Sequence, residues 1–177
     1  MPFTFKGGVH VDEHKNTRRS QIRRMPVPHE VVIPMNQHIG APCQPVVAAG
    51  DPVTRGQVIG TVQGALGCPV HASVSGIVKE ISYINDAQGR KIQSVVIESD
   101  GENTLCPDLK PFERPLTEAS ADEIVQVIRE AGICGMGGAG FPAYAKLQGA
   151  IGKAEKLIIN CAECEPFICE MCIRDSL

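Results

Sequence analysis

The stretch Gly135-Met136-Gly137-Gly138-Ala139-Gly140-Phe141-Pro142 places four glycines within six positions. Glycine has no side chain, so backbone N–H groups in such a loop stay open to an approaching anion. Pro142 is a favoured first helical residue, and a helix N-terminus that follows glycines binds phosphate groups readily. Lys146 lies about one turn into that helix. The stretch therefore predicts a phosphate cradle for a nucleotide or a flavin.

The segments around this loop argue against the standard dinucleotide turn, which needs a strand directly before the glycines. Ser120 and Glu123 form a capping-box pattern, and Gly132 is a suitable helix stop, so residues 120–132 read as a helix. One face of it is apolar and should be buried: Ile124, Val127, Ile128 and Ala131. An apolar strand, residues 157–159, and the polar turn 160–166 follow the second helix. The alternative interpretation is a tight glycine corner between two helices, with no ligand.

Composition excludes several classes of protein. The net charge of −3 and the pI near 5.9 give no reason to expect nucleic acid as a partner. No apolar run reaches the roughly 18 to 20 residues that span a bilayer, and the first residues lack the apolar core of a signal peptide. We therefore expect a cytosolic chain whose membrane association comes through a partner. Its single cysteines should be small buried hydrophobes without disulfides: Cys43, Cys68, Cys106 and Cys134.

Residues 31–99 read as short strands separated by glycine and proline. The expected strands are residues 31–33, 45–48, 58–62, 76–81 and 94–97. Within this region, residues 50–59 and 70–78 resemble the two halves of lipoyl and biotinyl domains. The hairpin between them, residues 63–69, contains no lysine, so we predict that this module carries no covalent lipoyl or biotinyl group. His71 is expected to be a packed residue and not a catalytic one.

The flanking regions are polar. Residues 1–30 hold four arginines within seven positions: Arg18, Arg19, Arg23 and Arg24. They form either a solvated extended arm or a docking strip for an acidic partner subunit or an anionic lipid surface. Prolines recur every four residues between 107 and 115, so residues 100–119 read as a linker.

The combination of these motifs resembles the C subunit of Rnf-type ion-translocating electron-transport complexes. The resemblance rests on residues 7–10, 32–34 and 37–42, the lipoyl-like segment, the glycine loop, and residues 158–166 with their Glu-Cys-Glu-Pro turn. The glycine loop and the last segment are also similar to the flavoprotein subunit of respiratory complex I. The fold class implied is mixed α+β: an all-β barrel-sandwich hybrid, followed by the start of an α/β FMN- and NADH-binding domain that is truncated here. The expected divisions are residues 1–30, 31–99, 100–119, 120–168 and an atypical tail, 169–177.

The resemblance implies a role for each site residue. Gly135, Gly137, Gly138 and Gly140 would line the FMN phosphate and isoalloxazine, and Lys146 would neutralise the phosphate. Asn160 and Glu163 would hold the polar edge of the flavin and its ribityl chain. Glu165 and Phe141 would face the nicotinamide nucleotide. This chain has Met136 where the complex I pattern usually has a basic residue, and Ala162 where it usually has an aspartate.

The resemblance also implies two [4Fe–4S] clusters, in a C-terminal part that this sequence does not contain. The cysteines near the end spell C-x2-C-x4-C-x2-C: Cys161, Cys164, Cys169 and Cys172. Such spacing is typical of metal sites, but four residues between the pairs leave little chain for tetrahedral geometry, so we predict no metal there.

The favoured hypothesis is the N-terminal part of a peripheral NADH-oxidising flavoprotein on the cytoplasmic face of the cell membrane. Its partners would be the other Rnf subunits, membrane and peripheral, with NADH as a direct and ferredoxin as an indirect partner. The alternatives are a complex I-like quinone reductase subunit and a non-catalytic docking scaffold.

Overall fold

The computed structural model describes residues 11–64, 66–110, 115–136, 138–156, 158 and 166–167. The chain divides into two compact units, which are considered separately. The larger unit, Pro26–Glu155, holds every strand and helix of the described residues. The smaller unit combines Met1–Met25 with Lys156–Leu177. In it, the ring of His14 stacks on that of Phe167 at 4.8 Å, and the Phe167 N–H donates to the Glu13 carbonyl.

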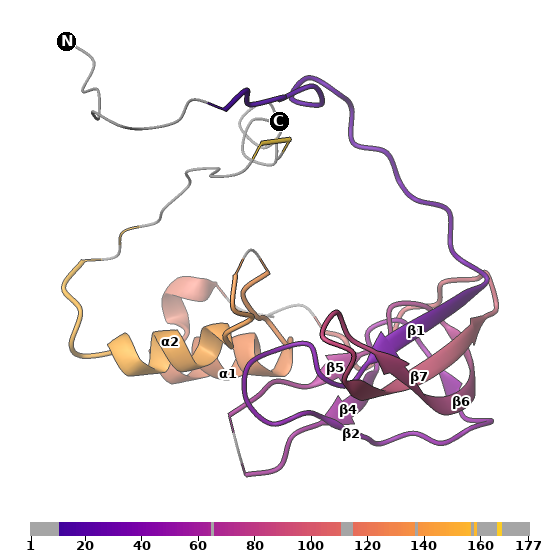
Figure 1. Cartoon of the computed structure of the whole chain (residues 1–177). Helices are drawn as coiled ribbons and strands as arrows, with labels where there is room; N and C mark the ends of the chain where they lie inside the picture. Colours follow the sequence, from indigo (N-terminus) through magenta and orange to yellow (C-terminus); the bar gives the residue numbers. More distant parts are fainter. Residues whose placement is uncertain are drawn as a thin grey trace. The chain divides into compact units, whose positions relative to one another are not determined.

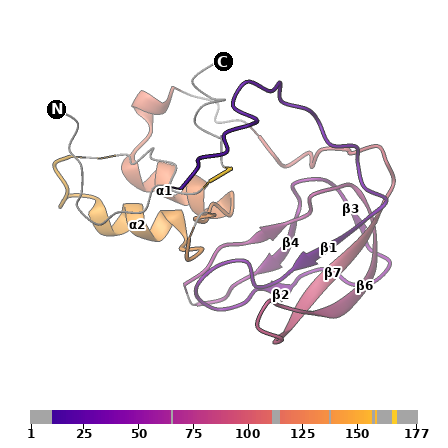
Figure 2. The same ribbon diagram turned by 45° about the horizontal axis from the view of Figure 1, so that its top comes forward.

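The larger unit begins with two antiparallel sheets (Figure 1). One has the strand order β1-β7-β6-β3, and its members are β1 (Glu30–Pro34), β3 (Pro52–Val53), β6 (Gly76–Asn85) and β7 (Lys91–Ser99). The other has the order β2-β4-β5, from β2 (Gln44–Pro45), β4 (Val58–Thr61) and β5 (Val70–His71). Figure 2 shows β1 beside the long β6–β7 hairpin.

Both sheets bury their inward side chains in one core, as a sandwich requires. The first sheet contributes Ile33, Val78, Val95 and Ile97, and the second contributes Ile59. β-branched residues dominate because they pack well on a pleated surface. The predicted all-β sandwich module is therefore confirmed. The strand predicted at residues 45–48 is wrong beyond Pro45, where β2 ends, although the Val46 N–H still donates to the Ile59 carbonyl at 2.9 Å.

The hairpin turn after β6 is held by one carboxylate. Asp86 accepts hydrogen bonds from the N–H groups of Gln88 and Arg90, at 2.9 and 2.8 Å, and from Arg90 Nε at 2.6 Å. Although partial desolvation acts in the opposite direction, these donors together lower the pKa of Asp86. The segment after β7, predicted as a linker, lies on the sandwich as far as it is described up to residue 110. The Cys106 N–H donates to the Arg55 carbonyl, and the Cys106 side chain is buried.

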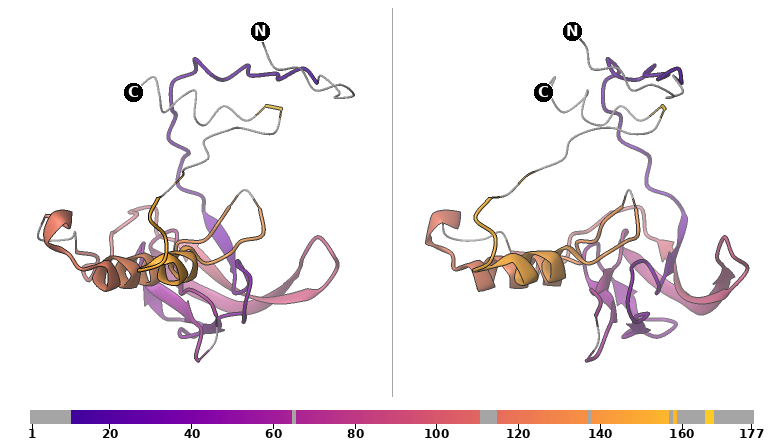
Figure 3. Two further views of the ribbon diagram at one scale, coloured as in Figure 1. Left: turned by 90° about the vertical axis from the view of Figure 1, so that its left-hand side faces the viewer. Right: turned by 60° about the vertical axis from the view of Figure 1, so that its left-hand side comes forward.

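Two helices follow, and they pack against each other (Figure 3, orange). Helix α1 (Ala121–Glu130) has Ser120 as its N-cap, with the predicted capping box: Glu123 N–H donates to Ser120 Oγ, and Ser120 N–H donates to the Glu123 carboxylate. Helix α2 spans Ala143–Ala150. Pro142, predicted as its first residue, is instead its N-cap, because its ψ of 123° is not helical.

The prediction for the buried face of α1 is partly wrong. Val125 is the buried residue of this helix, whereas Val127 is exposed. Val125 packs with Tyr144 of α2 and with Cys68 from the β4–β5 hairpin. The apolar periodicity of α1 alone therefore does not predict which of its residues the tertiary contact buries. The predicted strand 157–159 lies outside the described residues apart from Ile158, which is exposed and not in a strand.

Candidate functional site: a cavity between the glycine loop and the sandwich

The glycine loop is closed at its base by two backbone hydrogen bonds. Ala143 N–H donates to the Ile133 carbonyl at 2.9 Å, and Gly135 N–H donates to the Phe141 carbonyl at 3.0 Å. At the start of the loop, Gly132 has a φ of +69°, and a Cβ there would lie 2.6 Å from the Pro69 carbonyl oxygen. Only glycine fits this position, because α1 ends directly against the strand β5.

The tip of the loop is open. Met136 is 98% exposed, and a Cβ built on Gly138 would meet no atom within 4 Å. Among the residues that the structure describes, the N–H groups of Met136, Gly138 and Ala139 have no acceptor. Unpaired backbone donors on an open glycine loop can bind an anion or the acceptor edge of a ring.

The far end of the loop is hydrogen-bonded to the sandwich. The Ile39 N–H donates to the Gly140 carbonyl at 3.0 Å. Gly140 has a φ of +66°, and a Cβ at this position would lie 3.4 Å from the Cα of His38. The segment before β2 therefore fixes the position of the last glycine of the loop, Gly140.

His38 organises the inner side of this junction. His38 Nε2 lies 3.1 Å from the Cys68 backbone nitrogen and 3.0 Å from the Cys68 carbonyl oxygen, and Nδ1 lies 3.2 Å from the Ile39 carbonyl oxygen. The Cys43 thiol donates to the Cys68 carbonyl at 3.1 Å. Both ring nitrogens of His38 are thus occupied, and the residue serves the structure.

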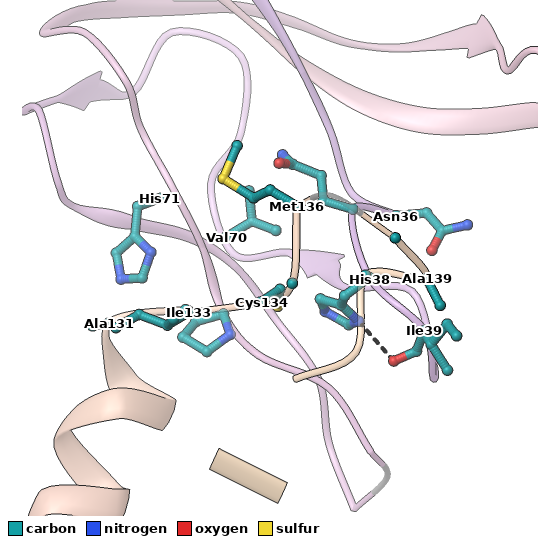
Figure 4. Close-up of a pocket in the computed structure, with 16 residues that line it drawn as sticks. Asn36, His38, Ile39, Val70, His71, Ala131, Ile133, Cys134, Met136 and Ala139 are labelled. Atoms are coloured by element: carbon teal, nitrogen blue, oxygen red, sulfur yellow. Dashed lines mark hydrogen bonds between the residues drawn. The ribbon is translucent and has the colours of Figure 1, made fainter. Parts of the chain in front are cut away.

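A cavity of about 750 Å³ lies between the sandwich and the loop (Figure 4). The sandwich side is formed by residues 36–39 and 69–71, and the other side by residues 131–136 and 138–140. Gly135, Gly138 and Gly140 line it. A volume in this range suits a cofactor-sized ligand.

His71 lies on the cavity wall next to the end of α1. Burial lowers the pKa of His71, and a hydrogen bond with the Glu130 backbone carbonyl opposes this shift only in part. The imidazole is therefore neutral at neutral pH. Its prediction as a packed residue agrees with this position beside Gly132.

The thiols of Cys43, Cys68 and Cys134 lie near one another, and Cys134 lines the cavity. Burial, together with the neighbouring Cys134 thiol, raises the pKa of Cys68 to about 12, and burial also raises the pKa of Cys43. All the cysteines of the described residues are free, as expected: Cys43, Cys68, Cys106 and Cys134. The first three are buried, and Cys134 is half-buried. Within this described part, no group of His, Cys, Asp or Glu side chains could hold a metal ion.

Two predicted site residues lie together outside the cavity wall. Lys146 is exposed on α2, and its Nζ lies 5.9 Å from the centroid of the Phe141 ring. The remaining predicted residues lie outside the described part of the chain: Gly137, Asn160, Glu163 and Glu165. The four tail cysteines lie outside it too.

Sequence reasoning misses the sandwich side of the site. Asn36 and His38 belong to it, and the sequence alone assigns a role to neither. The motif containing Gln37 and His38 is recognisable, but a motif alone does not reveal which later segment packs on it. The fold and the cavity together define a class: a β-sandwich module joined, through a shared ligand-sized cavity, to a glycine loop between two helices.

Comparison with known proteins identifies the family. Residues 3–102 match the family model of the RnfC barrel sandwich hybrid domain, and residues 128–172 match that of the Nuo51 FMN-binding domain. The chain is 44% identical over 169 residues to the C subunit of the Na⁺-translocating ferredoxin:NAD⁺ oxidoreductase complex of Acetobacterium woodii. It is 42% identical over 167 residues to the C subunit of the proton-translocating ferredoxin:NAD⁺ oxidoreductase complex of Clostridium ljungdahlii. Each match covers 93% of this chain, which belongs to the RnfC family.

The predicted resemblance and the predicted fold class, a barrel-sandwich hybrid followed by an FMN-binding domain, are confirmed. The chain spans 38% and 36% of the lengths of these two relatives. In the part of the chain that the structure describes, no helix is both long and apolar enough to cross a membrane. The domain boundaries and the roles of single site residues stay predictions.

Proposed function

We propose that this chain forms the N-terminal part of the NADH-oxidising flavoprotein subunit of an Rnf-type complex. In this function the complex exchanges electrons between NAD(H) and ferredoxin and couples the exchange to ion translocation. The observation that carries the proposal is the extended match to two RnfC relatives, which includes the glycine loop and its cavity. Both relatives bear the name of a ferredoxin:NAD⁺ oxidoreductase complex.

The residues present fit FMN. The unpaired N–H groups at the loop tip are donors for a phosphate or for a flavin carbonyl, and the open space at Gly138 lets a ligand approach the backbone. In our assignment Gly135, Gly137, Gly138 and Gly140 line the flavin. FMN, when bound, supplies the hydride-accepting ring that NADH reduces.

The other residues of the chain bind and orient the two nucleotides. Lys146 neutralises the flavin phosphate, as its exposed ammonium allows. Asn160 and Glu163 hold the polar edge of the flavin and its ribityl chain. Phe141 and Glu165 face the nicotinamide nucleotide. The two [4Fe–4S] clusters that complete the route would belong to a part of the subunit beyond this sequence.

The proposed location is the cytoplasmic face of the cell membrane, reached through the other subunits of the complex. The absence of a membrane-spanning helix from the described residues is compatible with a peripheral position. The proposed partners are the other subunits of the complex. Nucleic acid is not among the proposed partners.

The test is the flavin content of the complete subunit that carries this chain. We expect the purified protein to show flavin absorbance that NADH bleaches, whereas a docking scaffold would bind neither nucleotide. Lys146→Ala removes a charge-assisted contact worth roughly 1.5–3 kcal/mol, and should weaken FMN binding about ten- to a hundredfold. Lys153→Ala, which removes an exposed lysine just beyond α2, is the matched control.

The variant Glu165→Gln tests the placement of NADH independently of FMN binding. A carboxylate that orients NADH contributes little to flavin retention, so this variant should keep FMN while NADH reduces it more slowly. If Lys146→Ala and Glu165→Gln both lost flavin to the same extent, or if neither variant changed anything, these assignments would be wrong.

A further inference from the structure

Positive charge is concentrated in the polar segment that precedes β1. Residues 15–29 hold five of the 17 Lys and Arg residues of the chain and none of its 20 Asp and Glu residues. The five basic residues lie within residues 15–25 of the smaller unit, which we call the basic strip: Lys15, Arg18, Arg19, Arg23 and Arg24. The rest of the chain is acidic, so the strip differs in charge from everything around it.

The guanidinium groups of the basic strip are open to an external anion. All four arginines are exposed. Within the described part of the chain, none of them forms an ion pair, although Arg18 lines the same surface hollow as Asp12 and Glu13. A cluster of exposed cations attracts anionic partners over a distance of about a Debye length.

Apolar side chains lie between these charges. Ile22 is 68% exposed and Met25 is 79% exposed, and together they flank Arg23 and Arg24. Basic side chains interleaved with exposed apolar ones suit the surface of an anionic membrane. There the cations bind lipid phosphates while the apolar groups enter the interface, and the two contributions add.

The backbone of the basic strip favours a lipid surface over an acidic protein. Residues 20–28 form no helix or strand, and in the described structure the N–H groups of residues 21–25 donate to no backbone carbonyl (Figure 1). In an extended chain, consecutive side chains point to opposite sides, so each pair of neighbouring arginines places one charge on either side.

A protein surface would cover only one of these sides. A layer of lipid head groups, in contrast, offers phosphates on both sides of the strip. The unpaired N–H groups keep the strip at the level of the head groups, because hydrocarbon provides no acceptor for them.

Resting on the function proposed above, which brings the subunit to a membrane, we propose that the basic strip binds anionic phospholipid head groups directly. The four arginines contact the lipid phosphates, and Ile22 and Met25 enter the interface between them. The same surface repels the acidic remainder of the chain, so the strip is the part of this chain that faces the bilayer.

The first measurement is co-sedimentation of the purified complete subunit with vesicles, made either of phosphatidylcholine alone or of equal parts of phosphatidylcholine and phosphatidylglycerol. Binding should require phosphatidylglycerol. It should be lost when the salt concentration rises from about 0.1 M to about 1 M, because the Debye length falls from about 10 Å to about 3 Å. Arg23→Gln should weaken binding about fivefold. Arg55→Gln, at an exposed arginine of the sandwich, is the matched control and should have no effect.

The second measurement separates charge from shape. Exchange of all four arginines for lysine keeps the charge but removes the planar guanidinium fork, so binding to the mixed vesicles should change by less than about threefold. The double variant Ile22→Ser and Met25→Ser removes apolar area and should weaken binding about three- to tenfold. Val46→Ser, at an exposed valine after β2, is its control.

The outcomes are distinct. The proposal is overturned if the unaltered subunit does not bind the mixed vesicles at low salt, or if a variant with all four arginines exchanged for glutamine binds them equally well. It is also overturned if that glutamine variant still binds the vesicles but no longer co-purifies with the other subunits, which would assign the strip to an acidic partner. A subunit that binds the vesicles through the strip but carries no flavin that NADH reduces would support the lipid contact and overturn the proposed function.

Discussion

The variant Gly138→Ala, which adds a single methyl group, should weaken ligand binding without changing the stability of the fold. A Cβ there would meet no atom within 4 Å, and the backbone of Gly138 does not have the left-handed φ that Gly140 has. Alanine therefore fits without strain, and the free energy of unfolding should change by no more than about 0.5 kcal/mol. If the loop backbone contacts FMN, the same methyl group occupies ligand space. Overpacking of this kind costs about 1–3 kcal/mol, a five- to 150-fold loss of affinity.

The assay is a titration of the flavin-free complete subunit with FMN, followed by quenching of flavin fluorescence, beside a thermal melt monitored by circular dichroism. Gly149→Ala is the matched control, because this glycine of α2 also has open space around it but lies outside the loop. Unchanged FMN affinity in Gly138→Ala, in a subunit that does bind FMN, would refute close contact between the loop backbone and the flavin.

Three further outcomes are expected. Gly76→Ala should destabilise the sandwich by about 3 kcal/mol more than Gly89→Ala in urea unfolding, because the new Cβ would overlap the Glu98 carbonyl oxygen of β7, whereas the one at Gly89 meets nothing. The free energy of unfolding should fall as the pH drops through 6.5, because the pKa of His71 is lowered in the folded chain and the unfolded chain therefore binds more protons. His71→Gln should make the free energy of unfolding depend less steeply on pH, and an unchanged dependence would contradict this role of His71. Cys68 should resist iodoacetamide at pH 8 in the folded chain, because a pKa of about 12 leaves almost no thiolate; alkylation as fast as that of Cys134 would count against its burial.

Local signals in the sequence predict most of the fold. The capping box at Ser120 marks the start of α1, and the runs of branched residues locate the longer strands. The strands β3 and β5 escape prediction, since two residues are too few to show an alternating pattern. The burial of Val125 escapes it because Cys68, a residue distant in the sequence, decides which side of the helix is covered.

The candidate site is predicted less completely than the fold. Glycine density reveals an open backbone, and three of the predicted glycines do line the cavity: Gly135, Gly138 and Gly140. The opposite wall cannot be found in this way. Asn36 precedes the loop by about a hundred positions, and long-range contacts such as the hydrogen bond between Ile39 and Gly140 bring the two segments together. Long-range pairing of this kind has no local sequence signature.

The hairpin between β4 and β5 differs from the corresponding hairpin of lipoyl and biotinyl carrier domains. In lipoyl and biotinyl domains the corresponding tip carries the modified lysine and travels between distant active sites. Here Gln63 and Gly64, before the turn of the hairpin, are exposed, whereas Cys68, close to β5, is 1% exposed and packs against Val125 and Tyr144. The end of the hairpin next to β5 is therefore packed against α1 and α2. The same packing joins the sandwich to both helices, so a substitution at Cys68 should disturb the sandwich and the helix pair together.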